Sequence, residues 1–305
     1  MILRVTAVFA DIDFNPRILS GLEKQNISEP TEVQAQMLPL AMAGKDLKVC
    51  AETGSGKTLA YLLPIMEKLL QVDASDSATR ALVLVPTREL ARQVFKAAKQ
   101  ITDFTTLNVG VLTGGEEFKY QASMLRKNPE IIISTTGRLV DHIRRETVDL
   151  SDLEFLVLDE ADRMLDMGFM PDVERICAAL PAERQTLLFS ATLDGNIGRI
   201  AHQILRNPKT IQVASQTQKH ENIEQRLHFV DDMTHKNKLL EHLLIAPEVN
   251  QVIVFTSTKR HADLLAEDLY AAGHKTAALH GDMTQGARNR TLTKLRHGDV
   301  KVLVA

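Results

Sequence analysis

A glycine-rich octapeptide in the first quarter of the chain has the composition of a phosphate-binding loop. Its residues are Ala51, Glu52, Thr53, Gly54, Ser55, Gly56, Lys57 and Thr58. It follows an apolar run (47–50) and precedes an amphipathic one (59–70), so it lies between a predicted strand and a predicted helix. There, backbone N–H groups and the helix N-terminus attract phosphate oxygens. Lys57 is placed to reach the β- and γ-phosphates of a nucleotide and Thr58 to bind Mg²⁺. The usual pattern starts with Gly where Ala51 stands, but an ordinary strand–helix turn is the weaker interpretation.

Two adjacent carboxylates, Asp159 and Glu160, directly follow the apolar run 155–158. A carboxylate at the end of a buried strand can hold, usually through water, the Mg²⁺ that Thr58 also contacts. Glu160 could then position and activate an attacking water. Alone, such a dipeptide is most often a solvated loop. Together with the phosphate loop, it favours binding and hydrolysis of a nucleoside triphosphate.

The segment Pro30 to Gln34 predicts the start of a helix. Thr31 is a candidate N-cap, and Gln34 stands three residues later, as in a capping box. A Gln amide can also donate to N7 and accept from the N6 amino group of adenine, which guanine cannot match. The residues alone leave both roles of Gln34 open.

Other polar clusters follow predicted strands and mix hydroxyls, glycines and arginines. The candidates for contact with nucleic acid are Pro86, Thr87, Arg88, Gly114, Gly115, Thr135, Gly137 and Arg138. Such groups suit sugar–phosphate contacts with little base readout. Because the sequence has no Trp and only three Tyr, stacking of aromatic side chains on bases is not the expected mode of binding. A surface ion pair is the alternative for each arginine.

Alternating strands and helices surround these clusters. Expected strands are 47–50, 81–85, 109–112, 131–134, 155–158 and 186–189, and expected helices are 16–22, 59–70, 89–102, 119–127, 138–145, 171–180 and 197–205, besides the one that opens near Thr31. This order predicts a doubly wound α/β domain over residues 1–213, whose ligands bind at the carboxyl ends of the strands. Residues 214–222 are polar and aperiodic, as in a linker. Strands at 226–230, 252–255, 276–279 and 301–304 then alternate with helices at 236–244, 260–271 and 285–296. Because the chain stops on a buried-looking strand, we expect the second α/β domain, 223–305, to be incomplete.

The composition is that of a globular protein of about two domains: 305 residues, 44% hydrophobic and 25% charged. The net charge of −3 gives no global signature for nucleic acid, so polyanion binding must come from a local patch. Cys50 and Cys177 are expected to be small buried residues in a reducing compartment. No apolar run approaches the roughly 18 residues of a membrane span. Neither a membrane segment nor a signal peptide is expected, and the cytoplasm is the default location.

In this order, the phosphate loop and the clusters at 86–90, 113–115, 135–138, 159–162 and 190–192 resemble the DEAD-box RNA helicases, whose name spells residues 159–162. The resemblance covers essentially the whole chain. It implies two RecA-like domains that close on ATP, Mg²⁺ and RNA. It also implies that Phe9 packs on adenine, within an adenine-reading segment of about 7–35 that includes Thr31 and Gln34. Ser190 and Thr192 match the motif that couples hydrolysis to strand separation. In the second domain, Thr256, Gln285 and Arg288 match motifs that face RNA.

Some positions depart from the family pattern. Asn26-Ile27 replaces the usual Gly-aromatic pair, and Thr136 stands where Pro is commoner. Together with residues 163–169, the stretch 135–138 resembles a bacterial subgroup that acts in ribosome assembly. No strong arginine-finger candidate stands in the first domain. In the family, the motifs that bring the arginine fingers follow a stretch that residues 302–305 resemble.

The leading hypothesis is an ATP-dependent RNA helicase, in which domain closure on ATP bends one strand and hydrolysis releases it. An ATP-gated RNA clamp or assembly platform, with incidental unwinding, is the alternative. A P-loop enzyme acting on a small molecule or on DNA is disfavoured, because it has no use for the clusters at 87–88, 114–115 and 135–138. The expected partner is RNA, structured or ribosomal, and the protein is expected to be a monomer.

Overall fold

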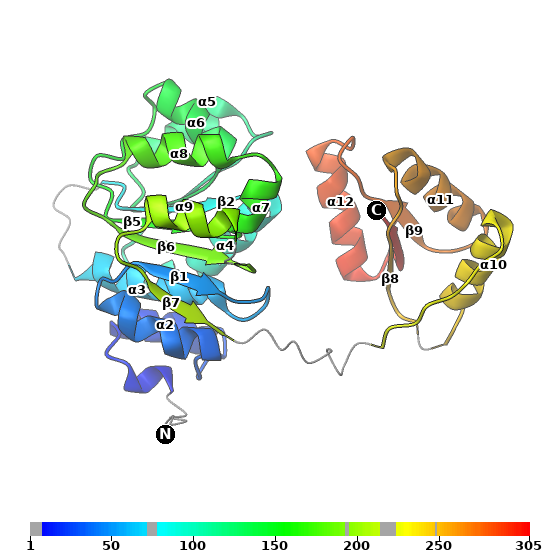
Figure 1. The fold of residues 1–305 in the computed structure, drawn as a ribbon, viewed down its shortest axis with the longest axis horizontal. Coiled ribbons are helices and arrows are strands. Elements are labelled where there is room, and N and C mark those ends of the chain that lie inside the picture. Colours follow the sequence, from blue (N-terminus) through cyan, green and yellow to red (C-terminus); the bar gives the residue numbers. More distant parts are fainter. Residues whose placement is uncertain (1–7, 72–77, 193–194, 214–223, 248) are drawn as a thin grey trace. The chain divides into compact units, whose positions relative to one another are not determined.

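A computed structural model describes residues 8–71, 78–192, 195–213, 224–247 and 249–305. The chain divides into two compact units, Met1–Glu221 and Asn222–Ala305 (Figure 1). The predicted linker, 214–222, lies outside the described residues, as does Ala7 at the start of the predicted adenine-reading segment. Among the described helices, none combines the length and the apolar character that crossing a lipid bilayer requires.

The first unit is built on a parallel sheet of seven strands in the order β3-β4-β2-β5-β6-β1-β7. The strands are β1 (Leu47–Cys50), β2 (Ala81–Val85), β3 (Val109–Leu112), β4 (Ile131–Thr135), β5 (Phe155–Leu158), β6 (Gln185–Ser190) and β7 (Lys209–Gln212). The predicted fold class is confirmed. Strand β7 was not predicted, because at this sheet edge only Ile211 is buried and its neighbours along the strand are exposed.

Helices cover both faces of this sheet (Figure 1). The 3-10 turn η1 (Phe9–Asp11) and helices α1 (Pro16–Lys24), α2 (Glu32–Met42), α3 (Lys57–Leu70) and α4 (Arg88–Thr102) pack on one face, and α5 (Phe118–Leu125), α6 (Thr136–Arg144), α7 (Ala161–Asp166), α8 (Met170–Ala179) and α9 (Asn196–Ile204) pack on the other. Successive residues of a strand enter different cores, since Val83 belongs to the first and Leu84 to the second. Burial on both faces explains why the strands are apolar runs without alternation. The short helix α7 was not predicted.

Side-chain caps set where several helices begin. Asn15 Oδ1 accepts from Arg17 N–H at 3.0 Å ahead of α1, and Thr87 Oγ1 accepts from Leu90 N–H at 3.2 Å ahead of α4. The predicted capping box of Thr31 and Gln34 opens α2. The N-termini of α2 and α4 lie beside the loops that follow β1 and β3, since Gln34 bonds to Gly56 and Arg88 lies over Gly114.

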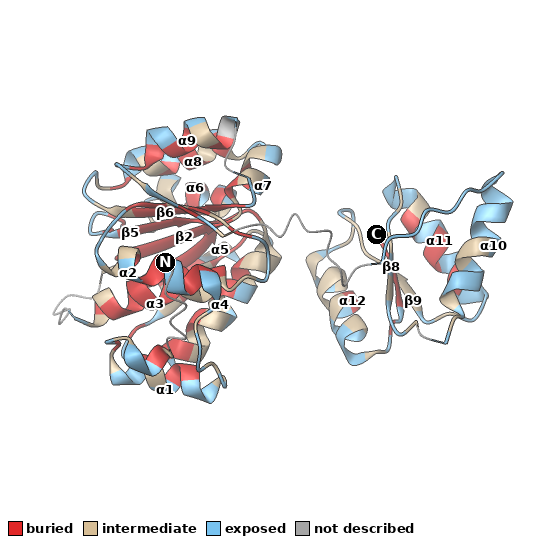
Figure 2. Ribbon diagram, turned by 60° about the horizontal axis from the view of Figure 1, so that its bottom comes forward, coloured by how far each residue is buried: buried red, intermediate tan, exposed pale blue. Residues whose placement is uncertain are grey.

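The second unit is smaller. Its parallel sheet has three strands in the order β8-β10-β9, with β8 (Val252–Val254), β9 (Thr276–Ala278) and β10 (Val302–Val304). Its helices are α10 (Met233–Leu244), α11 (Lys259–Ala271) and α12 (Gln285–His297). The core joins one side of α11 to Val302 and Val304. Figure 2 shows that buried residues are concentrated in the first unit, whereas most of α10 and α12 is exposed or half-buried.

The prediction of a strand at 226–230 is wrong. The described stretch 224–230 contains no helix or strand, and the side chains of Leu227 and Phe229 are 81% and 85% exposed. A strand requires a neighbour for its N–H and C=O groups, and no described strand of the second sheet pairs with this stretch. The alternation of apolar and polar residues at 226–230 therefore indicated strand propensity, but this stretch has no pairing partner among the described strands.

We predict that Gly21→Ala destabilises the first unit. A Cβ at Gly21 would lie 3.0 Å from Cα and 3.2 Å from Cδ1 of Ile101, so α1 would have to move away from α4. Such overpacking typically costs about 1–3 kcal/mol of unfolding free energy, measurable by urea denaturation. Gly137→Ala, in α6, is the matched control because no heavy atom lies within 4 Å of its added Cβ. Equal losses in the two variants would contradict the close contact between α1 and α4.

Candidate functional site

Strand order brings the predicted nucleotide-binding loops together. Because β6 lies between β1 and β5, the loops that follow these three strands are neighbours at the carboxyl edge of the sheet. Ala51 N–H donates to the Ser190 carbonyl at 3.3 Å, and Ala191 N–H donates to Asp162 Oδ2 at 3.1 Å. The phosphate loop, the 159–162 tetrapeptide and the Ser190–Thr192 segment are thus hydrogen-bonded into one site.

The phosphate loop contains two backbone positions that require glycine, since Gly54 and Gly56 have φ of 86° and 95°. Ser55 Oγ donates to the Glu52 carbonyl at 2.8 Å and closes the turn. Lys57 is the first residue of α3 and is buried, and its Nζ donates to the Ala51 carbonyl at 3.0 Å. The rest of the loop is accessible: Glu52, Thr53 and Gly54 are exposed and Thr58 is half-buried.

Gln34 connects helix α2 to the phosphate loop. Its Oε1 accepts from Thr31 N–H and its Nε2 donates to the Gly56 carbonyl, both at 2.9 Å. An amide has two hydrogens and two lone pairs, so one of each remains for a base. Gln34 is 2% exposed, so it caps α2 and holds the phosphate loop from within the fold.

Phe9 lies in the first core. Its ring is 2% exposed, and its centroid is 6.4 Å from that of Phe14. As folded, this ring offers almost no open face for stacking on a base. The family role of Phe9 would require the turn η1 to move.

Asp159 is 2% exposed, and its two carboxylate oxygens differ. Oδ2 accepts from the Tyr61 hydroxyl at 3.1 Å, whereas Oδ1 has no hydrogen-bond partner among the described groups. Burial raises the pKa of Asp159, and the charge of Lys57 opposes that rise. Burial and the charge of Asp159 also raise the pKa of Tyr61, so its hydroxyl stays a donor.

A buried carboxylate oxygen without a partner fits a cation ligand. The Thr58 hydroxyl also interacts with Tyr61, which places it close to Asp159. No group of three or more His, Cys, Asp or Glu side chains converges on a metal position in the described part of the chain. A hydroxyl, a carboxylate, water and phosphate oxygens form the donor set that Mg²⁺ prefers, so Thr58 and Asp159 suit this metal.

Glu160 has an unusual backbone for a residue with a side chain. Its φ of 54° and ψ of 52° are left-handed, and it occupies the N-cap position of α7 without a capping hydrogen bond from its side chain. Non-glycine residues in this region are strained and are common at functional sites. Its Oε2 lies 3.7 Å from Arg163 Nη1. The Ser190 hydroxyl, also at this edge, is buried and accepts from Thr192 N–H at 3.3 Å, while Thr192 is exposed.

The predicted RNA contacts follow a different set of adjacent strands, β3, β4 and β2. Thr87 caps α4, and the next residue, Arg88, extends its guanidinium over Gly114 and Gly115. A Cβ at Gly115 would collide with that guanidinium, so the glycines allow the arginine to lie across the turn. Arg138 reaches the same loop, since its Nη2 donates to the Glu116 carbonyl at 2.9 Å.

The remaining residues predicted to contact RNA line the same edge. Pro86 is buried, Thr135 is half-buried and Gly137 is exposed. The sheet edge thus has a β5-β6-β1 half with the phosphate loop and carboxylates, and a β3-β4-β2 half with hydroxyls, glycines and arginines.

In the second unit, the predicted residues lie after β8 and β9. Thr256 N–H donates to the Ala305 carbonyl at 2.7 Å, which fixes the end of β8. Gln285 and Arg288 occupy the first turn of α12, where Gln285 Nε2 donates to Asn289 Oδ1 at 3.2 Å. All three residues are half-buried.

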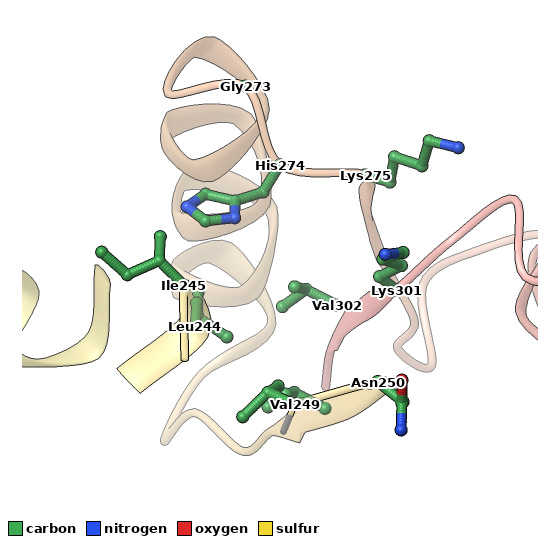
Figure 3. A pocket seen from close by; sticks show the side chains of 10 residues that line it. Leu244, Ile245, Val249, Asn250, Gly273, His274, Lys275, Lys301 and Val302 are labelled. Carbon is green, nitrogen blue, oxygen red and sulfur yellow. The ribbon is translucent and has the colours of Figure 1, made fainter. Parts of the chain in front are cut away.

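A pocket of about 300 Å³ opens at the other edge of this smaller sheet. Its lining residues lie at the amino ends of the three strands, and Figure 3 shows the His274 ring and Ile245 on one side of it and Lys301 on the other. The predicted RNA contacts follow these strands, so the pocket is separate from them.

Four further residues at the carboxyl edge of the first sheet were not predicted from the sequence: Tyr61, Glu116, Gln121 and His142. Tyr61 lies one helical turn after Lys57 in α3, so its position near the phosphate loop could have been anticipated. Gln121 and His142 carry no motif signal, because a polar residue in an amphipathic helix indicates an exposed face unless its burial is known.

Comparison with known proteins agrees with this geometry. The DEAD/DEAH box helicase family model matches residues 31–200, and the helicase conserved C-terminal domain model matches residues 235–305. The chain is 40% identical to the ATP-dependent RNA helicase SrmB of Escherichia coli over 97% of this chain and 67% of SrmB. It is 41% identical to the ATP-dependent RNA helicase DeaD of the same organism over 97% of this chain and 47% of DeaD. The chain therefore spans about two thirds of one relative and about half of the other.

Solved structures are similar as well. Saccharomyces cerevisiae Dbp5 bound to RNA and ADP BeF3 aligns with a TM-score of 0.86 at 28% identity, over 98% of this chain and 75% of Dbp5. A DEAD box protein from Methanococcus jannaschii aligns with a TM-score of 0.65 at 32% identity, over 99% of this chain and 80% of that protein. The predicted RecA-like architecture is confirmed. By sequence, fold and the Asp-Glu-Ala-Asp tetrapeptide at the end of β5, the chain belongs to the DEAD-box RNA helicase family.

Proposed function

We propose that this protein is an ATP-dependent RNA helicase that couples ATP binding and hydrolysis to local unwinding of RNA duplexes or remodelling of ribonucleoproteins. The observation that carries the proposal is the division of one sheet edge into a half suited to nucleotide phosphates and a half suited to an RNA backbone. The adjacent strands β5 and β2 join the two halves. A shift of the nucleotide loops is therefore passed through packed strands to the RNA loops.

In the nucleotide half, residues 51–58 cradle the phosphates and Lys57 neutralises them. Thr58 and Asp159 would hold Mg²⁺, whose charge stabilises the negative charge that develops on the γ-phosphate. Glu160 orients the attacking water, and Gln34 reads the adenine edge with its remaining hydrogen-bonding groups. Ser190 and Thr192 transmit the state of the nucleotide, because their segment is bonded to both Ala51 and Asp162.

In the other half, the glycine turn, the Thr87 and Thr135 hydroxyls, and Arg88 and Arg138 contact sugars and phosphates. These groups read no base edges, so binding is independent of base sequence. A continuous RNA backbone in the A-form geometry suits such contacts. We assign residues 1–213 to an ATP-binding domain, 214–222 to a linker, and 223–305 to a helicase domain. That domain adds RNA contacts through Thr256, Gln285 and Arg288.

The substrate we propose is structured or ribosomal RNA, with a role in ribosome assembly that follows from the resemblance of the 135–138 and 163–169 stretches to that bacterial subgroup. The identities to SrmB and DeaD are nearly equal, so they do not themselves select a subgroup. We further propose a monomer that works in the cytoplasm.

The decisive experiment compares ATP hydrolysis with single-stranded RNA and with DNA of the same sequence, alongside unwinding of a short RNA duplex. A helicase shows RNA-specific stimulation and ATP-dependent strand release. ATP-dependent RNA retention without strand release would instead support the alternative, an ATP-gated clamp. Stimulation by DNA equal to that by RNA would overturn both.

We predict that Gly56→Ala abolishes productive nucleotide binding. The new Cβ would lie 2.7 Å from both Gln34 Nε2 and Thr31 Oγ1, in a backbone conformation that disfavours any side chain. We expect ATP affinity, measured by calorimetry, to fall at least tenfold more in Gly56→Ala than in Gly54→Ala. This difference corresponds to about 1.4 kcal/mol of binding free energy. Gly54→Ala is the matched control, with positive φ and no heavy atom within 4 Å of its Cβ. Equal affinities would show that the contact between Gln34 and the loop is unimportant.

We also predict that Glu160→Gln preserves binding and stalls turnover. The amide keeps the size of the side chain but cannot accept a proton from water, so the steady-state ATPase rate should fall about 100-fold. ATP and RNA affinities should stay within about threefold of wild type. That is below the tenfold change that a loss of about 1.4 kcal/mol of binding free energy would produce. Glu174→Gln, on the exposed side of α8, serves as control. An unchanged ATPase rate would remove Glu160 from the mechanism.

A further inference from the structure

A buried side chain, Gln121, lies beneath the glycine turn that follows β3. It belongs to α5, and none of its surface is exposed. Its Nε2 donates to the Thr113 carbonyl at 2.9 Å and to Glu116 Oε2 at 3.2 Å, and its Oε1 is 3.2 Å from His142 Nε2. Both amide hydrogens and the amide oxygen are therefore used.

The two acceptors of Gln121 flank the glycine pair. Thr113 directly precedes Gly114, and Glu116 directly follows Gly115. Two consecutive glycines restrict their own backbone very little, and Gly115 has φ of 78°. Their conformation must therefore be fixed from outside the turn. The Gln121 amide does this by bonding to the residue on each side.

Glu116 extends these bonds to neighbouring helices. Its Oε1 accepts from Arg92 Nη2 of α4 at 2.9 Å, and its carbonyl accepts from Arg138 Nη2 of α6 at 2.9 Å. Although partial burial raises the pKa of Glu116, the hydrogen bonds from Arg92 and Gln121 lower it below its ordinary value. The Glu116 carboxylate is thus a charged acceptor, which makes its hydrogen bonds from Arg92 and Gln121 stronger.

His142 supports the amide from below. Its ring is fully buried, lies 4.3 Å from the Phe118 ring in a stacked arrangement, and has Nδ1 2.8 Å from Thr147 Oγ1. Burial and the charge of Arg138 lower its pKa to about 4. The ring is therefore neutral near pH 7. The Thr113 carbonyl can only accept, so the Gln121 NH₂ group faces the turn and the Gln121 oxygen faces His142. The neutral ring therefore carries its proton on Nε2.

We propose that Gln121 is a positioning residue for RNA binding: it holds the Gly114-Gly115 turn, and through Glu116 the Arg138 guanidinium, in the conformation that receives an RNA backbone. The inference rests on the proposed function, in which the turn and Arg138 contact RNA. It adds a specific role for residues that do not touch RNA themselves.

The test is Gln121→Met, which keeps the length of the side chain and removes its hydrogen bonds. Affinity for a labelled single-stranded RNA is measured by fluorescence anisotropy with a non-hydrolysable ATP analogue, and affinity for the analogue by calorimetry. We expect at least a tenfold loss of RNA affinity and less than a twofold change for the nucleotide. In the ATPase assay, the RNA concentration for half-maximal stimulation should rise while the maximal rate is retained.

Gln185→Met is the matched control. Like Gln121, Gln185 donates two hydrogen bonds from its Nε2, here to the carbonyls of Ala41 at 3.0 Å and Lys45 at 2.7 Å, but it lies at the amino end of β6, away from the RNA loops. Its loss should lower the urea midpoint and leave RNA affinity unchanged. Equal losses of RNA affinity in the two variants would overturn the positioning role, because they would reflect general destabilisation.

A folded Gln121→Met variant with wild-type RNA affinity would also overturn the inference while leaving the proposed function intact. If wild type itself binds no RNA, the proposed function fails. Should Gln121→Met not fold, His142→Phe keeps an aromatic ring against Phe118 and removes the hydrogen bond to Gln121. That variant is expected to lose at least threefold in RNA affinity, and an unchanged affinity would overturn the inference.

Discussion

A parallel sheet brings the carboxyl end of every strand to one edge, and the candidate chemistry of the first unit depends on this constraint. Strands that are far apart in the sequence become neighbours there. β6 lies between β1 and β5, so its last residue, Ser190, bonds to the phosphate loop and the next residue, Ala191, bonds to Asp162. β4 similarly lies between β3 and β2. The order of the strands therefore determines which loops can act together.

Buried polar groups then fix the loops at this edge. Gln34 bonds to Gly56, Tyr61 bonds to Asp159, and Gln121 bonds on both sides of the glycine turn. In each case a buried side chain from a helix holds a loop that could otherwise adopt other conformations. Unpaired, such groups would be costly to bury, so each loop conformation is coupled to the packing of its helix.

The sequence predicted the elements with strong apolar runs, because burial on both faces leaves little room for polar residues. β1 to β6 and most helices belong to this class. It did not predict β7, where only Ile211 is buried, and it predicted a strand at 226–230 that lacks a partner. Pairing is a property of the whole sheet and cannot be seen within a short segment.

The same distinction applies to the site. Lys57 and Asp159 could be proposed as site residues because motif spacing and strand position coincide. Tyr61, Gln121 and His142 could not, since their importance follows from burial beneath loops. The structure also shows that Gln34 caps α2 and bonds to the phosphate loop at the same time, a combination that residue types alone left open.

The alternation of strand residues between two cores has a consequence for unfolding. Val83 and Leu84 are adjacent in β2 but stabilise opposite helical layers. Neither layer can separate from the sheet without exposing strands that the other layer also covers. The β5-β6-β1 and β3-β4-β2 halves of the edge should therefore melt as one cooperative unit, with amide hydrogens of β2 and β5 exchanging only through global opening.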